Sequence, residues 1–451
     1  MSDALPIRSH PDLDQYKELA EDLQRACRSA DPAAMGAWAV GWLEMLARLD
    51  GADPTALERR AAIAHEAGRI RERWRAFIDD GGRHASCLLA DAQLFVAREH
   101  GFNSWPTFAS HIDALKRPES AVSTFEAAVD AIVAGDAATL RRLLRERPEL
   151  VQARSTRDHQ STLLHYVSAN GVEDFRQITP SNIVEITRIL LEAGADVNAT
   201  SEAYGGGSTA LGLVATSIHP SAAGVQIPLL ELLLARGAQM EQPGLTGNGH
   251  SIVLGCLANG EGAAARFFAN RGDSMNLLEA AGVGRLDLVK TYFDGDGNLK
   301  SSGTEEQMEA GFLYACGYGA AEVAEFLLDR GVDPGTHNDR GQTGLHWAMY
   351  GPHVNVVTLL LRHGAPVNAR DATESTAVHW ALRGWALTTD AREREEYYHV
   401  VRLLIDAGAA VDLSRLEREH GRRRHVIEKV RSDSRMLELL RLSSGGGGTT
   451  G

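Results

Sequence analysis

Histidine has the widest chemical range of the side chains in this sequence, because its imidazole can bind a metal ion or carry a proton near neutral pH. The chain has seventeen histidines. Two of them, His346 and His379, lie in hexapeptides that start thirty-three residues apart and share one pattern, Thr-Gly-Leu-His-Trp-Ala and Thr-Ala-Val-His-Trp-Ala. His165 lies in a weaker copy. This recurrence indicates a repeat protein.

An acidic run between 294 and 305 is a second candidate for chemistry. Its oxygen-bearing side chains occupy positions 1, 3, 5 and 12 of a calcium-binding loop: Asp294, Asp296, Asn298 and Glu305. Four oxygen donors at that spacing can coordinate a hard cation. Position 6, however, is Leu299, where the sharp turn of such a loop requires glycine. We therefore favour a solvated loop between two repeats and predict no metal site.

Two other runs resemble ligand-binding motifs. Gly205-Gly-Gly-Ser-Thr209 is similar to part of a phosphate-binding loop, but no Gly-Lys-Ser/Thr follows it, and we interpret it as a turn with Thr209 as a helix cap. The basic run 422–425 is interpreted as a solvated surface. No Gly-x-Ser-x-Gly occurs, and no Cys–His pairing is indicated. We predict no catalytic residue and no cofactor.

Cysteine usage and the N-terminus bear on location. Cys27, Cys87, Cys256 and Cys316 show no Cys-x-x-Cys spacing, which favours reduced thiols in a cytosolic protein over a disulfide framework or a zinc site. The N-terminus has no basic segment followed by an apolar one, so we expect no export signal. The sequence therefore predicts a cytoplasmic protein.

The charge balance excludes some partners. A formal net charge of −14 disfavours attraction to phosphate backbones and anionic lipid surfaces, so we predict neither a nucleic-acid nor a membrane partner. The most apolar stretch, 33–49, contains Glu44 and Arg48 and is shorter than the roughly 20 apolar residues that span a bilayer. We expect a buried helix there.

A second recurring pattern marks the end of a helix and the turn that follows it. This pattern is Leu-Leu-x-x-Gly-Ala-Asp-x-Asn, and it is clearest at 190–198 and 360–368. We expect the glycine of each copy to end a helix in the left-handed conformation: Gly194, Gly237, Gly272, Gly331, Gly364 and Gly408. Together with the hexapeptides, this pattern resembles ankyrin repeats. The resemblance implies an all-α solenoid of about eight helix-turn-helix units, each shielding the apolar face of the next.

Four segments are predicted. They are an N-terminal helical domain at 1–118, the solenoid at 119–412, C-terminal capping helices at 413–442 and a flexible glycine-rich tail at 443–451. In the cap, five apolar residues should face the last repeat: Val426, Ile427, Val430, Leu437 and Leu440.

The N-terminal domain contains an apolar stripe at helical spacing from Trp38 to Leu49. The run 89–106 is similar to a segment of bacterial ankyrin-repeat proteins with an extra N-terminal helical region. Its helix-turn-helix appearance could suggest DNA binding, but the helix 104–115 offers His111 and no arginine or lysine for bases or phosphates. We expect this helix, with Ser104 as its N-cap, to pack on the first repeat.

Uneven spacing of the repeat glycines indicates insertions. Gly331 and Gly364 are 33 residues apart, whereas Gly364 and Gly408 are 44 apart. The surplus falls between the two helices of a repeat, around 172–182, 216–225 and 383–394. We expect three long loops that project from one edge of the solenoid, where insertions often build a binding face.

The resemblance also implies roles for single residues. His165, His346 and His379 should be structural, joining one unit to the next, with Gly212 and Leu313 replacing them elsewhere. Exposed positions vary between ankyrin repeats and contact partners. Carried onto the two best-matched units, with the neighbouring Trp385, they give these candidate partner-binding residues: Asp339, Arg340, Gln342, Tyr350, Ala372, Thr373, Ser375, Arg383 and Trp385.

The predicted function is a non-enzymatic interaction module that binds a partner protein through a concave groove, its turn tips and the inserted loops. Arg340, Tyr350, Arg383 and Trp385 are the expected anchors, because arginine and aromatic side chains dominate interface energetics. An alternative is that the N-terminal domain binds a small molecule or carries an activity that the repeats target. A third is a secreted effector. The sequence identifies neither the partner nor the oligomeric state.

Overall fold

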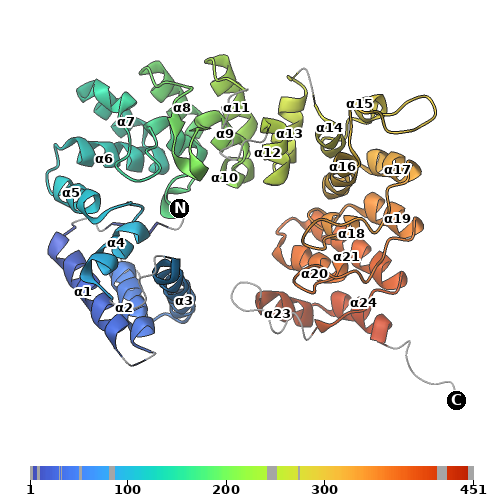
Figure 1. Ribbon diagram of the computed structural model, residues 1–451, viewed down its shortest axis with the longest axis horizontal. Coiled ribbons are helices and arrows are strands. Elements are labelled where there is room, and N and C mark those ends of the chain that lie inside the picture. Colours follow the sequence, from blue (N-terminus) through green and yellow to red (C-terminus); the bar gives the residue numbers. More distant parts are fainter. Residues whose placement is uncertain are drawn as a thin grey trace. The chain divides into compact units, whose positions relative to one another are not determined.

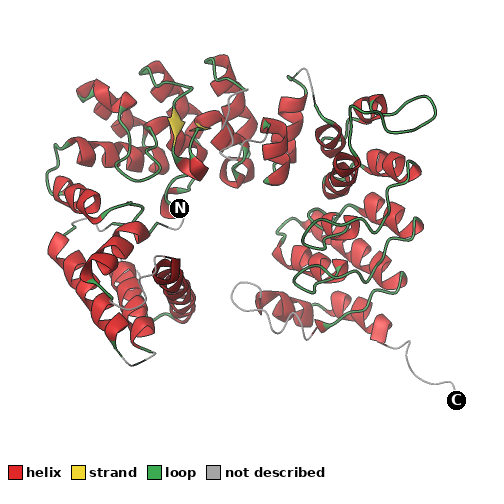
Figure 2. Cartoon of the chain, viewed as in Figure 1, coloured by secondary structure: helices red, strands yellow, loops and turns green. Residues whose placement is uncertain are grey.

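The computed structural model describes residues 4–7, 11–29, 31, 33–49, 53–80, 87–240, 251–272, 275–413 and 424–444. The chain forms two compact units, Met1–Ala264 and Ala265–Gly451. Each is built almost wholly from helices, with one short strand pair in the first (Figures 1 and 2).

The first unit begins with five helices: α1 (Leu13–Arg28), α2 (Ala34–Leu49), α3 (Leu57–Asp80), α4 (Leu89–Glu99) and α5 (Trp105–Leu115). They share a hydrophobic core that includes Trp42, Ile70 and Phe95. The stretch predicted as a buried helix is α2, whose Trp38 and Trp42 are buried. None of the described helices is both long and apolar enough to cross a bilayer.

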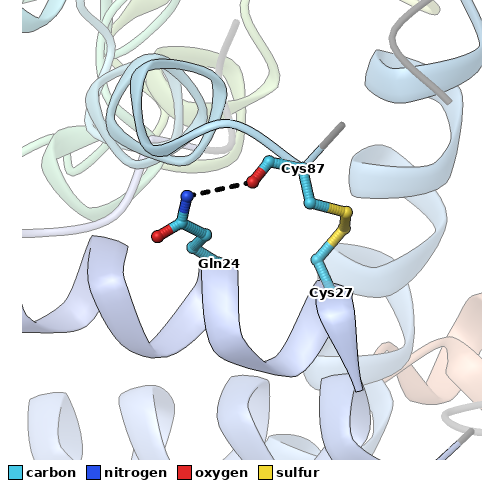
Figure 3. Close-up of a disulfide and its surroundings, with 3 residues drawn as sticks. All are labelled: Gln24, Cys27 and Cys87. Atoms are coloured by element: carbon cyan, nitrogen blue, oxygen red, sulfur yellow. Dashed lines mark hydrogen bonds between the residues drawn. A yellow bond between two sulfur atoms is a disulfide. The ribbon is translucent and has the colours of Figure 1, made fainter. Parts of the chain in front are cut away.

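A disulfide joins Cys27 on α1 to Cys87, just before α4 (Figure 3). The Gln24 side chain, one helical turn from Cys27, donates a hydrogen bond to the Cys87 carbonyl at 3.0 Å. The expectation of four reduced thiols is therefore wrong for this pair. Pairing depends on proximity in the fold, and a separation of 60 residues leaves no spacing motif in the sequence. Cys256 and Cys316 are free and buried.

Helix α5 confirms the packing interpretation of the run 89–106. Ser104 accepts a hydrogen bond from the Thr107 backbone N–H, and α5 packs against α6 (Ala121–Ala134) of the first repeat. His111 is buried, and its Nδ1 lies 2.7 Å from the Thr156 hydroxyl. Since His111 points inward, the helix presents no base-reading side chain at that position.

The remaining helices of the first unit form successive pairs. In chain order these are α6, α7 (Ala137–Glu146), η1 (Pro148–Gln152), η2 (Leu163–Ser168), η3 (Asp174–Arg176), α8 (Ile183–Glu192), η4 (Ala203–Gly205), α9 (Ala210–Ala215), α10 (Ile218–Ala222), α11 (Gln226–Ala235), α12 (Ile252–Ala258) and the first residues of α13 (Gly262–Ala269), a helix that spans the boundary between the units. In one pair the first member is the 3₁₀ helix η2, which packs against α6, α8 and α9. Strands β1 (Thr200–Ser201) and β2 (Ser208–Thr209) pair antiparallel. The glycine-rich run 205–207 is the turn between them, and Thr209 accepts a hydrogen bond from the Gly212 N–H, as predicted.

The second unit continues with four pairs around one core: α14 (Leu277–Gly282), α15 (Leu286–Thr291), α16 (Glu305–Gly317), α17 (Ala321–Asp329), α18 (Gly344–Trp347), α19 (Val354–Arg362), α20 (Ala377–Leu387) and α21 (Ala391–Asp406). The first helices α14, α16, α18 and α20 contact one another in sequence order. The second helices do the same, so each pair covers the next.

Two C-terminal helices, α23 (Arg424–Ser432) and α24 (Ser434–Ser444), close this core against α20 and α21. Val426, Ile427, Val430 and Leu440 are buried and Leu437 packs beside them, so the predicted cap is confirmed. Ser443 and Ser444 belong to α24 rather than to the predicted flexible tail. The rest of the tail lies outside the described residues, as do the side chains of the basic run 422–425.

Left-handed glycines end the helices at five of the six predicted positions. The φ angles of Gly194, Gly237, Gly331, Gly364 and Gly408 lie between 75° and 95°. The prediction is wrong for Gly272, whose φ is not positive. Its N–H donates to the Phe268 carbonyl at 2.9 Å, an i to i−4 bond that forms a turn just after the end of α13.

The three insertions do not form projecting loops, so that prediction is wrong. Residues 172–182 fold back as η3, and Arg176 is buried. Residues 216–225 contain the helix α10. Residues 383–394 lengthen α20 and α21 to 11 and 16 residues, against 4 and 9 for α18 and α19. Contacts with distant residues hold the extra chain, since Arg176 of the first insertion bonds Glu126 and Trp385 of the third packs against Tyr398.

Candidate partner-binding surface

The recurring histidines join neighbouring repeats. The Thr343 N–H donates to His346 Nδ1 at 3.1 Å, while His346 Nε2 lies 3.0 Å from the Ser375 carbonyl in the next repeat. Because Nδ1 accepts, the proton is on Nε2 and the imidazole is neutral. His165 bonds the Ser208 carbonyl and His379 the Asp412 carbonyl in the same way. The predicted structural role of all three is confirmed.

Burial stabilises this neutral form. Loss of hydration lowers the pKa of His346, and it lowers the pKa of His165 to about 4. The ring nitrogens of these histidines therefore take part in hydrogen bonds within and between the repeats. Where Gly212 and Leu313 replace histidine, Thr209 still caps its helix, and Leu313 is buried in the core.

In the loop that resembles a calcium site, the first carboxylate forms hydrogen bonds with backbone N–H groups of the same loop. Asp294 Oδ1 accepts hydrogen bonds from the N–H groups of Asp296 and Asn298, at 3.0 and 2.8 Å. Glu305 lies in the first turn of α16. Within the described part of the chain, no group of three or more His, Cys, Asp or Glu side chains is placed to hold a metal ion.

Five aromatic side chains from three successive repeats form a row, which we call the aromatic row: Tyr318, Tyr314, Trp347, Tyr350 and Trp380. Neighbouring ring centroids lie 6.4, 4.9, 5.6 and 5.4 Å apart in that order. Tyr350 is 60% exposed, and the other four are partly exposed. The row follows the ends of α16 and α18 and the first turn of α20.

Local packing holds these rings in place. Gly317 leaves room for Trp347, since a Cβ at that position would lie 2.9 Å from the ring atom Cε3. The Trp380 Nε1–H donates to Asp371 Oδ2 at 2.9 Å. Burial would raise the pKa of Asp371, but hydrogen bonds from Thr373, Ser375 and Trp380 outweigh it and lower the pKa. Asp371 is thus an ionised anchor for the Trp380 ring.

The structure places the nine predicted partner residues at different depths. Asp339, Arg340, Tyr350, Ala372 and Thr373 are exposed, and Gln342 and Arg383 are partly exposed. Ser375 and Trp385 are buried, so the assumption that they are exposed is wrong.

Both corrections have a packing reason. The Ser375 carbonyl bonds His346, and its N–H donates to Asp371 Oδ1, so Ser375 belongs to the junction between repeats. Trp385 lies on the part of α20 that the insertion adds, and its ring lies 5.9 Å from Tyr398 of α21 within the core. An insertion that lengthens both helices gives Trp385 a partner to pack against.

Sequence reasoning missed most of the aromatic row. It selected Tyr350 but treated the tryptophans of the two hexapeptides, Trp347 and Trp380, only as marks of the repeat. The signal was present, because both follow the buried histidine directly and therefore occupy a different face of the same helical turn. Tyr314 and Tyr318 lie four residues apart on α16 and its cap, which also places them on one face.

A second feature, in the first unit, is a buried cluster of charged residues. Arg157 Nη1 lies 2.9 Å from Glu126 Oε1 and 2.8 Å from Glu173 Oε1. Arg176 Nη1 lies 2.7 Å from Glu126 Oε2, and its Nη2 lies 2.7 Å from the exposed Asp130. Burial would raise the pKa of Glu173, but Arg157 and Arg176 outweigh it and hold the pKa well below the usual range. The cluster holds η3, the first insertion, against α6.

A cavity of about 650 Å³ borders this cluster. Its walls combine the two arginines with apolar residues such as Leu115 and Phe175. A more open depression of about 820 Å³ lies over α3 and α4, with Phe77, Phe95 and the Arg73–Glu99 ion pair in its wall. Within the buried cluster, Glu126 and Glu173 balance the charges of the two arginines.

The comparison with protein families decides the nature of the repeats. Residues 312–415 match the family model of ankyrin repeats, in three copies. The chain contains ankyrin repeats. The matched residues hold the whole aromatic row and all nine predicted partner residues. Ankyrin repeats are generally modules of protein–protein interaction and are typically not enzymes.

Solved ankyrin-repeat domains are also similar to this chain. The human ASB11 ankyrin repeat domain shares 19% sequence identity at a TM-score of 0.30, over 60% of this chain and 96% of that domain. The ankyrin repeat domain of Bcl-3, a member of the IkappaB protein family, shares 16% identity at a TM-score of 0.28, with the same coverage.

Proposed function

We propose that this protein is a non-enzymatic scaffold that binds a partner protein through the ankyrin-repeat face carrying Arg340 and Tyr350. The observation that carries the proposal is the exposure of Tyr350, 60% of whose surface is open to solvent although it packs between Trp347 and Trp380. A large aromatic side chain held rigidly at the surface loses little entropy on binding, which makes it a favourable anchor.

The seven candidate residues that are exposed or partly exposed remain our proposed contacts: Asp339, Arg340, Gln342, Tyr350, Ala372, Thr373 and Arg383. They come from the turn regions and first helices of two neighbouring repeats. Of the third insertion, only Arg383 belongs to these contacts, because that insertion lengthens α20 and α21 instead of forming a projecting loop.

The test is affinity capture from a lysate of the native host with the full chain and with a double variant, Arg340→Ala and Tyr350→Ala. We expect the captured partner to be lost in this variant, because both side chains are exposed and their removal leaves the repeat core intact. Arg362→Ala is the matched control, since Arg362 is exposed on the second helix of the same repeat. Unchanged recovery from the folded double variant would reject this surface.

The proposed location is the cytoplasm. The Cys27–Cys87 disulfide is the observation to set against it, because glutathione and thioredoxin keep cytosolic thiols reduced. Quenching of cells in acid and alkylation of the denatured protein at neutral pH, followed by mass spectrometry of the peptides containing Cys27 and Cys87, decides the point. Reduced thiols in cells support a cytoplasmic protein, and a fully formed disulfide supports an oxidising compartment.

A further inference from the structure

The aromatic row extends along the direction in which the repeats stack, because its rings come from three consecutive first helices, α16, α18 and α20. A ligand that contacts the whole row must therefore be elongated and must cross successive repeats. Packed helices lie about 8–10 Å apart, so an elongated ligand that crosses the repeats meets the aromatic side chains of the next repeat at about that interval.

A polyproline II helix has this period. It has three residues per turn and a rise of about 3.1 Å per residue, so one turn advances about 9 Å. A proline at every third position would then meet each repeat in turn. Polyproline II segments dock in aromatic-lined grooves, and they lose little entropy because the extended conformation is preformed.

Charged groups of both signs lie at the row, since Arg340 and Arg383 are positive and Asp371, which accepts from the Trp380 Nε1–H, is negative. Arg340 is exposed, and its backbone carbonyl accepts from the Ala372 N–H of the next repeat at 2.7 Å. Burial raises the pKa of Tyr350, and the positive charge of Arg340 opposes this rise. Arg383, whose Nη2 donates to the Ser375 hydroxyl at 3.1 Å, adds positive charge beside the neighbouring repeat. Asp371 already accepts hydrogen bonds from Trp380 and Ser375, whereas Arg340 is exposed, so a peptide residue that pairs with Arg340 must be acidic. A trimethylated lysine suits an aromatic cage and is therefore the competing ligand in the test.

We propose that the aromatic row binds a proline-rich peptide segment in the polyproline II conformation, with an acidic residue beside the prolines that pairs with Arg340. This inference rests on the proposed function and names the chemistry of the partner. The prolines pack against Tyr314, Tyr350 and Trp380, and the acidic residue fixes which end of the peptide lies at Arg340.

The test uses the full chain and fluorescein-labelled synthetic peptides in fluorescence anisotropy titrations. The probe carries two aspartates followed by three prolines at every third position, separated by alanines. Three other peptides replace the prolines with alanine, replace the aspartates with lysine, or carry trimethyl-lysine in place of the prolines. We expect the probe to bind, the alanine peptide to bind at least about tenfold more weakly, and the lysine peptide to lose the salt dependence of the probe.

Variants locate the binding. Tyr350→Ala should weaken binding of the probe by about tenfold or more, as expected for a hot-spot residue. Arg340→Ala should abolish the preference for aspartate over lysine. Leu387→Ala is the matched control, because Leu387 is an exposed apolar residue on α20 outside the aromatic row, and it should leave binding unchanged. Circular dichroism melting curves check that each variant is folded.

Some outcomes would reject only the proline-rich assignment, and others would also reject the proposed function. Equal binding of the alanine peptide, stronger binding of the trimethyl-lysine peptide, or no effect of Tyr350→Ala overturns the proline-rich assignment. If the peptides fail but capture of the native partner still depends on Arg340 and Tyr350, only this inference is rejected. If that capture is also insensitive to both residues, the proposed function is rejected with it.

Discussion

His346 and Ser375 belong to different repeats, and the His346 Nε2–H donates a hydrogen bond to the Ser375 backbone carbonyl at 3.0 Å. The other ring nitrogen accepts from the Thr343 N–H that begins its own helix. One buried side chain thus caps a helix and joins it to the next repeat. The same arrangement recurs at His165 and His379, so the stability of the array depends on buried imidazoles.

Replacing His346 with alanine should destabilise the second unit. The variant leaves the Thr343 N–H and the Ser375 carbonyl without their partner, and each unsatisfied buried group costs about 1–3 kcal/mol. Urea denaturation followed by circular dichroism should show an earlier transition. His363→Ala is the control, because His363 is exposed at the end of α19, and its transition should coincide with that of the parent chain.

Stability should fall as the solution is acidified below pH 6.5. Burial lowers the pKa of His100, His111 and His165 from 6.5 to about 4 in the folded protein. Between those values the unfolded chain binds protons that the folded chain does not, so stability is full above pH 6.5 and decreases toward pH 4. His165→Gln should flatten this decrease in thermal melts from pH 7.5 to 4.5. An unchanged slope would show that His165 does not contribute to it.

Ankyrin architecture could be predicted from the sequence because short motifs fix its junctions. Each Thr-x-x-His hexapeptide begins a helix and each left-handed glycine ends one, so both depend on residues close in the sequence. Five of the six glycines have the expected conformation. Gly272 differs because its N–H bonds the Phe268 carbonyl in a turn that needs no positive φ, which the glycine type alone does not indicate. The repeat pattern also located the exposed Arg340 and Tyr350 correctly.

Features that depend on distant contacts could not be predicted. Arg176 lies in an insertion that looks polar, yet it is buried because Glu126, fifty residues earlier, neutralises it. Trp385 is predicted to be exposed but is buried, because its ring packs against Tyr398 on the other side of the insertion 383–394. The sequence does not show that this insertion brings the two rings together. The Cys27–Cys87 pair is a contact of the same kind.

The disulfide should contribute substantially to the stability of the first five helices. Closing a loop over a separation of 60 residues stabilises the folded state by about 4 kcal/mol in the chain-entropy description. Dithiothreitol should therefore lower the melting temperature of the full chain. A double variant, Cys27→Ser and Cys87→Ser, should melt at the lower temperature with and without the reductant. Equal effects of the reductant on both proteins would contradict a role for this bond.

The buried charge cluster should be sensitive to the loss of one carboxylate. Glu126→Gln leaves Arg157 and Arg176 with Glu173 as their buried counter-charge, and an uncompensated buried charge costs about 3–5 kcal/mol. Asp130→Asn is the matched control, since Asp130 also pairs with Arg176 but its side chain is 67% exposed. Its effect should stay within about 1 kcal/mol. Urea denaturation of both variants gives the comparison.

Site-specific photo-crosslinking tests most directly whether the face carrying Tyr350 binds the partner. Tyr350→p-benzoylphenylalanine places a photoreactive ring at the exposed position in the aromatic row, and Arg362→p-benzoylphenylalanine places it on the second helix of the same repeat. After irradiation in a lysate of the native host, we predict a discrete adduct with one protein at Tyr350 and none at Arg362. No adduct at Tyr350, or the same adduct at both positions, would contradict the account.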